Sequence, residues 1–345
     1  MTARPRPARR RRRGLTALGM GLVPILVSAC GVSLGDDGPA LQVYSARSYG
    51  AEQAYARFTE ETGIRVEFLN GNDAELRERL QAEGDDSPAD VFMTVDVANL
   101  ALAAEQGVFR SLTSPELEAA VPEDLRDPQG RWFGLSVRAR AIIYNTDAVD
   151  PSELSTYEAL ADPAFGDRLC LRTATSAYTQ SLVASMIANL GPEAARAAVE
   201  GWVANDPQIL ANDNEVVRTV APGGCDVGVT NHYYLARELD ADPDLGVGLF
   251  WPDQATSGAH VNISGAGVTQ STDSPEEAER FIAWLATTGQ SPFVDGNFEY
   301  PVNAEVEPVE QLGEFGEFER DPINVGELGR YNAEAVQLLT DAGYR

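Results

Sequence analysis

The chain has 345 residues, with 26 Lys and Arg residues against 53 Asp and Glu residues and a formal net charge of −27. Every basic residue is arginine. So acidic a chain disfavours nucleic acid and anionic membranes as binding partners, and its length is more than one simple core normally holds, which favours two lobes.

The first 29 residues have the pattern of a signal peptide. Five consecutive arginines at 9–13 precede an apolar run over 15–27 that is too short to span a membrane. Small residues stand directly before Cys30, as in a bacterial lipobox, which predicts cleavage before this cysteine and its lipidation. Both the Sec and the twin-arginine export routes fit the arginine run. Residues 30–40 are rich in Gly, Asp and Ser and predict a flexible tether.

Strand and helix patterns alternate from residue 41 onward. Apolar runs predict strands at 41–45, 64–69 and 89–94, and amphipathic stretches predict helices at 51–62, 73–83 and 97–106, the first of them ended by Gly63. Such a βαβαβα run predicts a parallel sheet with helices on both faces. Residues 139–144 then form an extended crossing segment.

A second α/β set begins near residue 151. It contains a strand starting at Cys170, helices at 179–190 and 192–202, and a buried parallel strand at 226–230. Residues 260–268 predict a second crossing strand. Ser274, Pro275 and Glu277 predict a capping box that opens a helix reaching 286, and a last helix is expected over 326–342. Two crossing segments between two α/β lobes are typical of a hinged, two-lobed binding protein.

Two cysteines remain beyond Cys30, and each stands at the start of a strand-like run. A disulfide between Cys170 and Cys225 would join neighbouring strands and contribute roughly 3–4 kcal/mol. Two buried free thiols are the alternative, and two cysteines at this spacing do not make a zinc site.

Catalytic motifs are scarce in the sequence. The only histidines are His232 and His260, and neither has a Cys or Ser partner in a known motif. There is no nucleophile elbow, P-loop or His-Glu-x-x-His sequence. An enzyme is therefore not favoured.

Four tyrosines follow predicted strands of the two lobes: Tyr49 in the first lobe, and Tyr178, Tyr233 and Tyr234 in the second. Ligands of open α/β sheets bind at the carboxyl ends of the strands, where helix N-termini favour negative charge. A phenol is neutral at pH 7, so such a place matters when a hard metal ion removes its proton. The alternative for the adjacent pair is that one ring packs in the core and the other faces solvent. Tyr44 and Tyr55 are expected in the core.

The sequence contains several distinctive blocks in a fixed order, at 44–49, 87–91, 138–145, 154–163, 178–185, 231–234 and 260–265. Together these blocks resemble the ferric-iron-binding proteins of ABC importers, in the branch found in cyanobacteria. The resemblance covers nearly all of 41–345 and implies a periplasmic-binding-protein fold, in which each lobe is a mainly parallel sheet and a two-segment hinge joins the lobes. It also implies that Tyr49, Tyr178, Tyr233 and Tyr234 ligate Fe(III).

The resemblance extends to arginines that hold a carbonate-like anion beside the iron in some relatives. Arg47 and Arg138 are similar to those residues, Arg140 is an alternative, and pairing of any of the three with acidic side chains is equally compatible with the sequence. Many relatives carry His where this chain has Ser48, so water or a small anion would fill a fifth position. Four phenolates on Fe(III) leave one net negative charge, which arginines and helix N-termini could offset.

The expected function is that of an extracytoplasmic solute-binding protein, anchored by lipid on Cys30 or periplasmic, that delivers Fe(III) to an ABC permease and its ATPase. We expect a monomer with an N-terminal lobe of 41–141 and 262–312 and a C-terminal lobe of 142–261 and 313–345. The alternative is a protein of the same fold for another solute, an anion or a polyamine, whose tyrosines stack or hydrogen-bond. An exported enzyme that uses the cleft is less favoured, because four tyrosinates leave little open coordination.

Overall fold

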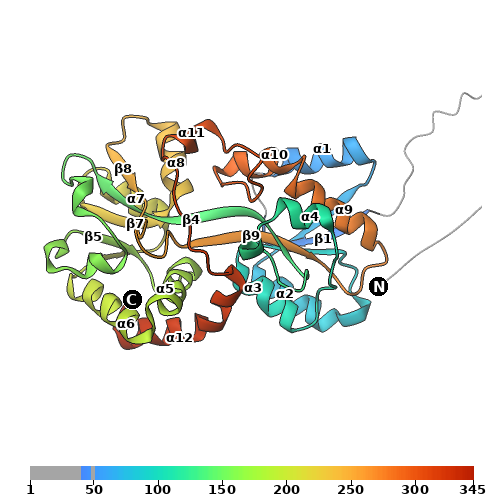
Figure 1. The fold of residues 1–345 in the computed structure, drawn as a ribbon, viewed down its shortest axis with the longest axis horizontal. Coiled ribbons are helices and arrows are strands. Elements are labelled where there is room, and N and C mark those ends of the chain that lie inside the picture. The colour runs from blue at the N-terminus through green and yellow to red at the C-terminus, as the bar shows by residue number, and fades with distance from the viewer. Residues whose placement is uncertain (1–39, 48–50) are drawn as a thin grey trace, which may run out of the picture. The chain divides into compact units, whose positions relative to one another are not determined.

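A computed structural model describes residues 40–47 and 51–345 (Figure 1). The predicted signal peptide, Cys30, most of the tether, Ser48 and Tyr49 lie outside the described residues. Residues Pro39–Arg345 form one compact unit. Within the described ranges, no helix combines the length and the hydropathy that a membrane crossing requires.

The strands of the described residues form one nine-stranded sheet in the order β2-β1-β3-β9-β4-β7-β5-β6, with β8 paired to β4. The strands are β1 (Leu41–Ser45), β2 (Val66–Asn70), β3 (Val91–Thr94), β4 (Phe133–Asn145), β5 (Leu169–Arg172), β6 (Gln208–Leu210), β7 (Val227–Asn231), β8 (Val247–Phe250) and β9 (Val261–Val268). Strands that follow a βα unit pair in parallel: β1 with β2 and β3, and β5 with β6 and β7. The predicted crossing segments are the antiparallel strands β4 and β9, which join these two groups.

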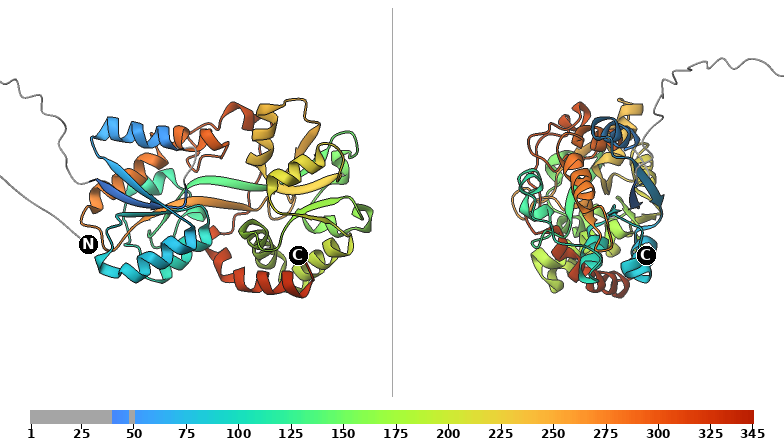
Figure 2. Two further views of the ribbon diagram at one scale, coloured as in Figure 1. Left: turned by 180° about the vertical axis from the view of Figure 1, so that it is seen from behind. Right: turned by 90° about the vertical axis from the view of Figure 1, so that its right-hand side faces the viewer.

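Helices cover both faces of each group of strands, as the alternating pattern predicts (Figure 1). They are α1 (Glu52–Thr62), α2 (Asp73–Glu83), α3 (Val97–Glu105), α4 (Pro115–Ala120), α5 (Ala177–Leu190), α6 (Pro192–Ala204), α7 (Asp213–Val220), α8 (His232–Ala241), α9 (Pro275–Ala286), α10 (Gln290–Val294), α11 (Glu310–Gly313) and α12 (Leu328–Asp341). In Figure 1 and in the left view of Figure 2, α12 runs along α5 and reaches α3 of the first group.

The buried apolar side chains form one cluster around β1, β3 and β9 and two clusters around β5 and β7. The largest fully buried side chains of the first cluster include Phe58, Met93 and Trp132. Tyr44 is buried and Tyr55 packs against Phe68 with ring centroids 4.3 Å apart, so both serve the core as predicted. The lobe boundaries themselves remain a prediction.

Two helix ends test the capping predictions. Gly63 ends α1 in the left-handed region, with φ 75°, as expected for a C-terminal glycine. The capping box of α9 is wrong: Ser274 is the N-cap, but its side chain makes no capping hydrogen bond. Its backbone N–H, which Glu277 would need, already donates to the Thr272 hydroxyl at 2.9 Å.

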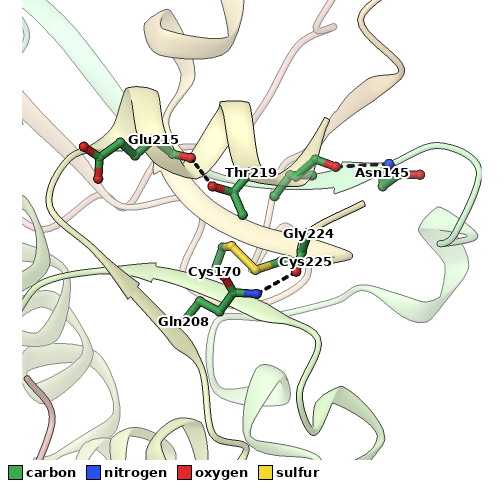
Figure 3. The surroundings of a disulfide bond; sticks show 8 residues. Asn145, Cys170, Gln208, Glu215, Thr219, Gly224 and Cys225 are labelled. Atoms are coloured by element: carbon green, nitrogen blue, oxygen red, sulfur yellow. Dashed lines mark hydrogen bonds between the residues drawn. A yellow bond between two sulfur atoms is a disulfide. The ribbon is translucent and has the colours of Figure 1, made fainter. Parts of the chain in front are cut away.

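The disulfide between Cys170 and Cys225 is present, with the two Cα atoms 5.7 Å apart (Figure 3). Cys170 is the second residue of β5, and Cys225 lies two residues before β7. The disulfide therefore joins the N-terminal ends of these two strands. Beside it, the Gln208 side-chain amide donates to the Gly224 carbonyl at 2.6 Å. The disulfide and this hydrogen bond together tie β5 and β6 to the segment that precedes β7.

Candidate functional site

Three of the four predicted tyrosines converge where β5 and β7 end. Tyr178 lies in the first turn of α5, where the Ser176 side chain caps the helix by accepting from the Tyr178 N–H. Tyr233 and Tyr234 lie in the first turn of α8, directly after β7. Because β5 and β7 are parallel neighbours, the two helices begin at the same edge of the sheet. Tyr49 lies outside the described residues.

The phenol groups themselves are close together. The Tyr233 hydroxyl donates to the Tyr178 hydroxyl at 3.4 Å, and the rings of Tyr233 and Tyr234 contact each other with centroids 4.3 Å apart and planes tilted by 32°. Tyr233 is buried, whereas Tyr178 and Tyr234 are half-buried. One ring of the adjacent pair is thus buried, as the alternative expects, but its hydroxyl contacts Tyr178, and the neighbouring Tyr234 is only partly exposed.

The environment favours the protonated form of the Tyr234 phenol when no cation is bound. Burial raises the pKa of Tyr234, and the adjacent Tyr178 raises this pKa further. A second phenolate beside the first would repel it, since like charges disfavour ionisation. A cation at the point where the hydroxyls meet reverses this balance, because metal ligands bind deprotonated.

Arginines stack on all three rings. The Arg237 guanidinium lies 4.8 Å from the centre of the Tyr233 ring and 5.1 Å from that of Tyr234. Arg172 and Arg138 lie 4.8 and 5.7 Å from the centre of the Tyr178 ring. The cluster is therefore electropositive around its rim, which suits bound negative charge.

The three arginines considered for an anion occupy different places. Arg138 lies beside Tyr178, and one of its amino groups donates to the carbonyl oxygens of Val95 and Ile263. Arg47 forms a fully buried ion pair with Glu299 at 2.6 Å and donates to the Phe293 carbonyl. Arg140 forms a buried ion pair with Asp213 at 2.7 Å. Among these arginines, Arg138 contacts a predicted ligand tyrosine, because its guanidinium lies over the Tyr178 ring.

Sequence reasoning did not find Arg172, Asp213 or Arg237. Arg172 is the last residue of β5, so the argument that selected the tyrosines at carboxyl edges could have selected it too. Arg237 lies one turn after Tyr233 on α8, a spacing that also brings side chains together. Nothing local marks Asp213, which is one acidic residue among 53 and meets its partners only in the folded protein.

Both histidines serve the fold. His232 accepts from the Ala139 N–H at 3.1 Å and contacts the Phe298 carbonyl at 2.9 Å, and burial lowers its pKa to about 4. His260 contacts the Ser181 hydroxyl at 3.0 Å. In the part of the chain that the structure describes, no group of three or more His, Cys, Asp or Glu side chains is placed to hold a metal. A metal site within these residues would therefore depend on other donors, such as phenols.

Comparison with known proteins agrees with this architecture. The family model of bacterial extracellular solute-binding proteins matches residues 42–292. Iron uptake protein A1 of Synechocystis is 40% identical over 340 residues, which cover 93% of each chain. The chain belongs to this family of solute-binding proteins.

Solved structures of the family superpose closely. FutA (IdiA) of Trichodesmium, solved in complex with iron and citrate, is 40% identical, with a TM-score of 0.85 over 89% of this chain and 100% of its own. The ferric binding protein of Campylobacter jejuni is 34% identical, with a TM-score of 0.80 over 88% of this chain and 100% of its own. The predicted family and the periplasmic-binding-protein fold are confirmed.

Proposed function

We propose that this solute-binding protein captures Fe(III) on the phenolates of Tyr49, Tyr178, Tyr233 and Tyr234 and delivers it to an ABC permease and its ATPase. The observation that carries the proposal is the meeting of three phenols from α5 and α8 at one sheet edge, with two hydroxyls 3.4 Å apart. Anionic oxygen ligands suit a hard trivalent cation. The Synechocystis relative is named for iron uptake, and the Trichodesmium relative was solved with iron.

The test is a titration of the purified protein with ferric citrate, followed by the visible phenolate-to-iron charge-transfer band. We expect a coloured complex whose band is lost or strongly weakened in Tyr178→Phe, Tyr233→Phe and Tyr234→Phe. Tyr44→Phe is the matched control. The Tyr44 hydroxyl donates a hydrogen bond to the Glu83 carboxylate at 3.0 Å and is not part of the tyrosine cluster. A colourless wild-type protein, or full colour in all three variants, would favour another solute such as an anion or a polyamine.

A small anion such as carbonate would complete the iron coordination, since Ser48 is a poor neutral ligand. Arg47 and Arg138 are the two predicted anion residues. The contacts support Arg138 more strongly, because it lies over Tyr178 while Arg47 is paired with Glu299. Arg138→Gln should weaken the dependence of ferric binding on added bicarbonate. An unchanged bicarbonate dependence would remove Arg138 from this role.

The remaining proposals concern closure and location. The protein would act as a monomer whose two lobes close on iron. The N-terminal lobe comprises 41–141 and 262–312, and the C-terminal lobe comprises 142–261 and 313–345. In X-ray scattering, we expect a smaller radius of gyration with iron than without it. Asn262 supports a link between the lobes, because its amide donates both to Asp96, the N-cap residue of α3, at 2.9 Å and to Ser181 of α5 at 3.2 Å. Lipid on Cys30 would anchor the exported protein, and Cys30→Ala should release it from the membrane fraction.

A further inference from the structure

A group of three charged side chains, two of them buried and one partly exposed, lies against Tyr178. Asp213, the first residue of α7, is fully buried and shares its carboxylate between two arginines. One oxygen accepts from Arg140 at 2.7 Å, and the other accepts from Arg172. We call Arg140, Asp213 and Arg172 the charge triad. With two guanidinium groups and one carboxylate, it carries one surplus positive charge inside the protein.

The charge triad is attached to the elements that carry the tyrosines. Arg140 belongs to β4 and also donates to the Asn231 side chain at 3.2 Å and the Val229 carbonyl at 3.1 Å. Asn231 is the N-cap residue of α8. Arg172 ends β5, and its backbone carbonyl accepts from the Tyr344 hydroxyl at 2.8 Å. Both ends of the triad are therefore held in place by backbone contacts.

Arg172 is the member that faces the phenols. Its guanidinium lies 4.8 Å from the centre of the Tyr178 ring, and its side chain is 18% exposed, compared with 4% for Arg140. The ion pair with Asp213 holds it in this position. A second ring arginine, Arg237, is exposed, so water screens its charge more strongly.

The surplus charge is opposite in sign to the charge of the proposed site. Fe(III) with four phenolates carries one net negative charge, and a bound anion such as carbonate would add to it. A buried charge is costly unless it is paired. We propose that Arg172, positioned by Asp213, supplies the cation that compensates this negative charge and so raises the affinity for ferric iron. The inference rests on the proposed function and assigns a specific residue to it.

The experiment compares wild type, Arg172→Gln, Arg172→Met and Arg172→Lys by competition for Fe(III) against citrate and by the position of the charge-transfer band. We expect the two uncharged variants to lose affinity by about tenfold to hundredfold, because unit charges several ångströms apart interact at this level in a partly buried site. Their band should shift to longer wavelength, since a phenolate without a nearby cation gives up its electron more easily. Arg172→Lys, which keeps the charge, should retain most of the affinity.

Arg168→Gln is the matched control. Arg168 directly precedes the same strand and pairs with Asp226 at 2.7 Å, and its loss changes the net charge by the same amount. It should bind iron like wild type. Thermal unfolding of each variant identifies those that fold, and Arg172→Met carries the comparison if Arg172→Gln does not fold.

The outcomes separate the two proposals. A wild-type protein that does not bind ferric iron overturns the proposed function and the inference with it. A wild type that binds iron, together with uncharged variants of unchanged affinity and band position, overturns the inference alone. Equal loss of affinity in the glutamine, methionine and lysine variants with an unmoved band would show a purely structural role and also overturn it.

Discussion

Two regions of the protein contain arginine and carboxylate groups in direct ion pairs, but the balance of charge differs between them. Arg47 and Glu299 form a one-to-one pair at 2.6 Å with both side chains fully buried. In the charge triad, Asp213 is shared by two arginines, one of which lies against Tyr178. A pair that balances itself can serve the fold alone. A surplus buried charge calls for a further partner, and the tyrosine cluster is placed to provide a negative one.

The electrostatics of Glu299 agree with a structural role for its pair. Burial alone would raise the pKa of Glu299, but the charges of Arg47 and Arg138 outweigh burial and hold the pKa below its usual range. The carboxylate is therefore ionised at neutral pH. Since its folded pKa is depressed, its contribution to stability is present above about pH 4.3 and is lost as the pH falls below that value.

Breaking the balanced pair should have the largest effect on stability. Arg47→Met leaves the Glu299 carboxylate buried without its main partner, which should lower the free energy of unfolding by about 3–5 kcal/mol. Urea denaturation measures this loss. Arg57→Met is the matched control, because Arg57 pairs with Glu61 at the surface and its loss should cost about 0–1 kcal/mol. Equal, small losses in both variants would contradict a structural role for the buried pair.

Removing the disulfide should lower the stability of the fold without changing the binding of ferric iron. The double variant Cys170→Ala, Cys225→Ala should have a free energy of unfolding about 3–4 kcal/mol lower than wild type. The unfolded chain gains conformational entropy when the link between cysteines 55 residues apart is removed. The disulfide lies where β5 and β7 begin, whereas the tyrosines follow their other ends. The folded variant should therefore keep the wild-type ferric band. A lost band at a temperature where the variant is still folded would contradict this expectation.

A smaller effect on stability should come from His260, a buried histidine near Arg140 of the charge triad. Burial and the nearby Arg140 charge lower the pKa of His260 to about 3. The unfolded chain takes up this proton near pH 6.5 and the folded chain does not until about pH 3, so acidification favours unfolding across that window. Between pH 7 and pH 5 this one group should remove about 2 kcal/mol of stability. His260→Gln should flatten the pH dependence measured by urea denaturation, and an unchanged slope would contradict the prediction.

The sequence predicts those parts of the site that depend on local order along the chain. Tyr178, Tyr233 and Tyr234 each lie in the first turn of a helix that follows a strand, so their place at the sheet edge could be expected from the order of strands and helices. The same holds for the two cysteines at the starts of neighbouring strands and for Gly63 at the end of α1.

The charge partners could not be predicted, because they meet across long separations. Glu299 is 252 residues from Arg47, and Asp213 is 73 residues from Arg140. In so acidic a chain, no carboxylate stands out as the partner of any arginine. The Ser274 capping box failed for a related reason: the Thr272 hydroxyl, outside the motif, takes the N–H that the motif requires. Such competition between nearby donors and acceptors is decided only in the folded protein.

The most direct test of the account is an iron-loaded crystal structure with an anomalous signal measured at the iron absorption edge. We predict a single strong peak bonded to the phenolic oxygens of Tyr49, Tyr178, Tyr233 and Tyr234, with the Arg172 guanidinium still paired to Asp213 beside it. A peak bonded to carboxylates or histidines elsewhere, or phenolic oxygens that turn away from the iron, would contradict it.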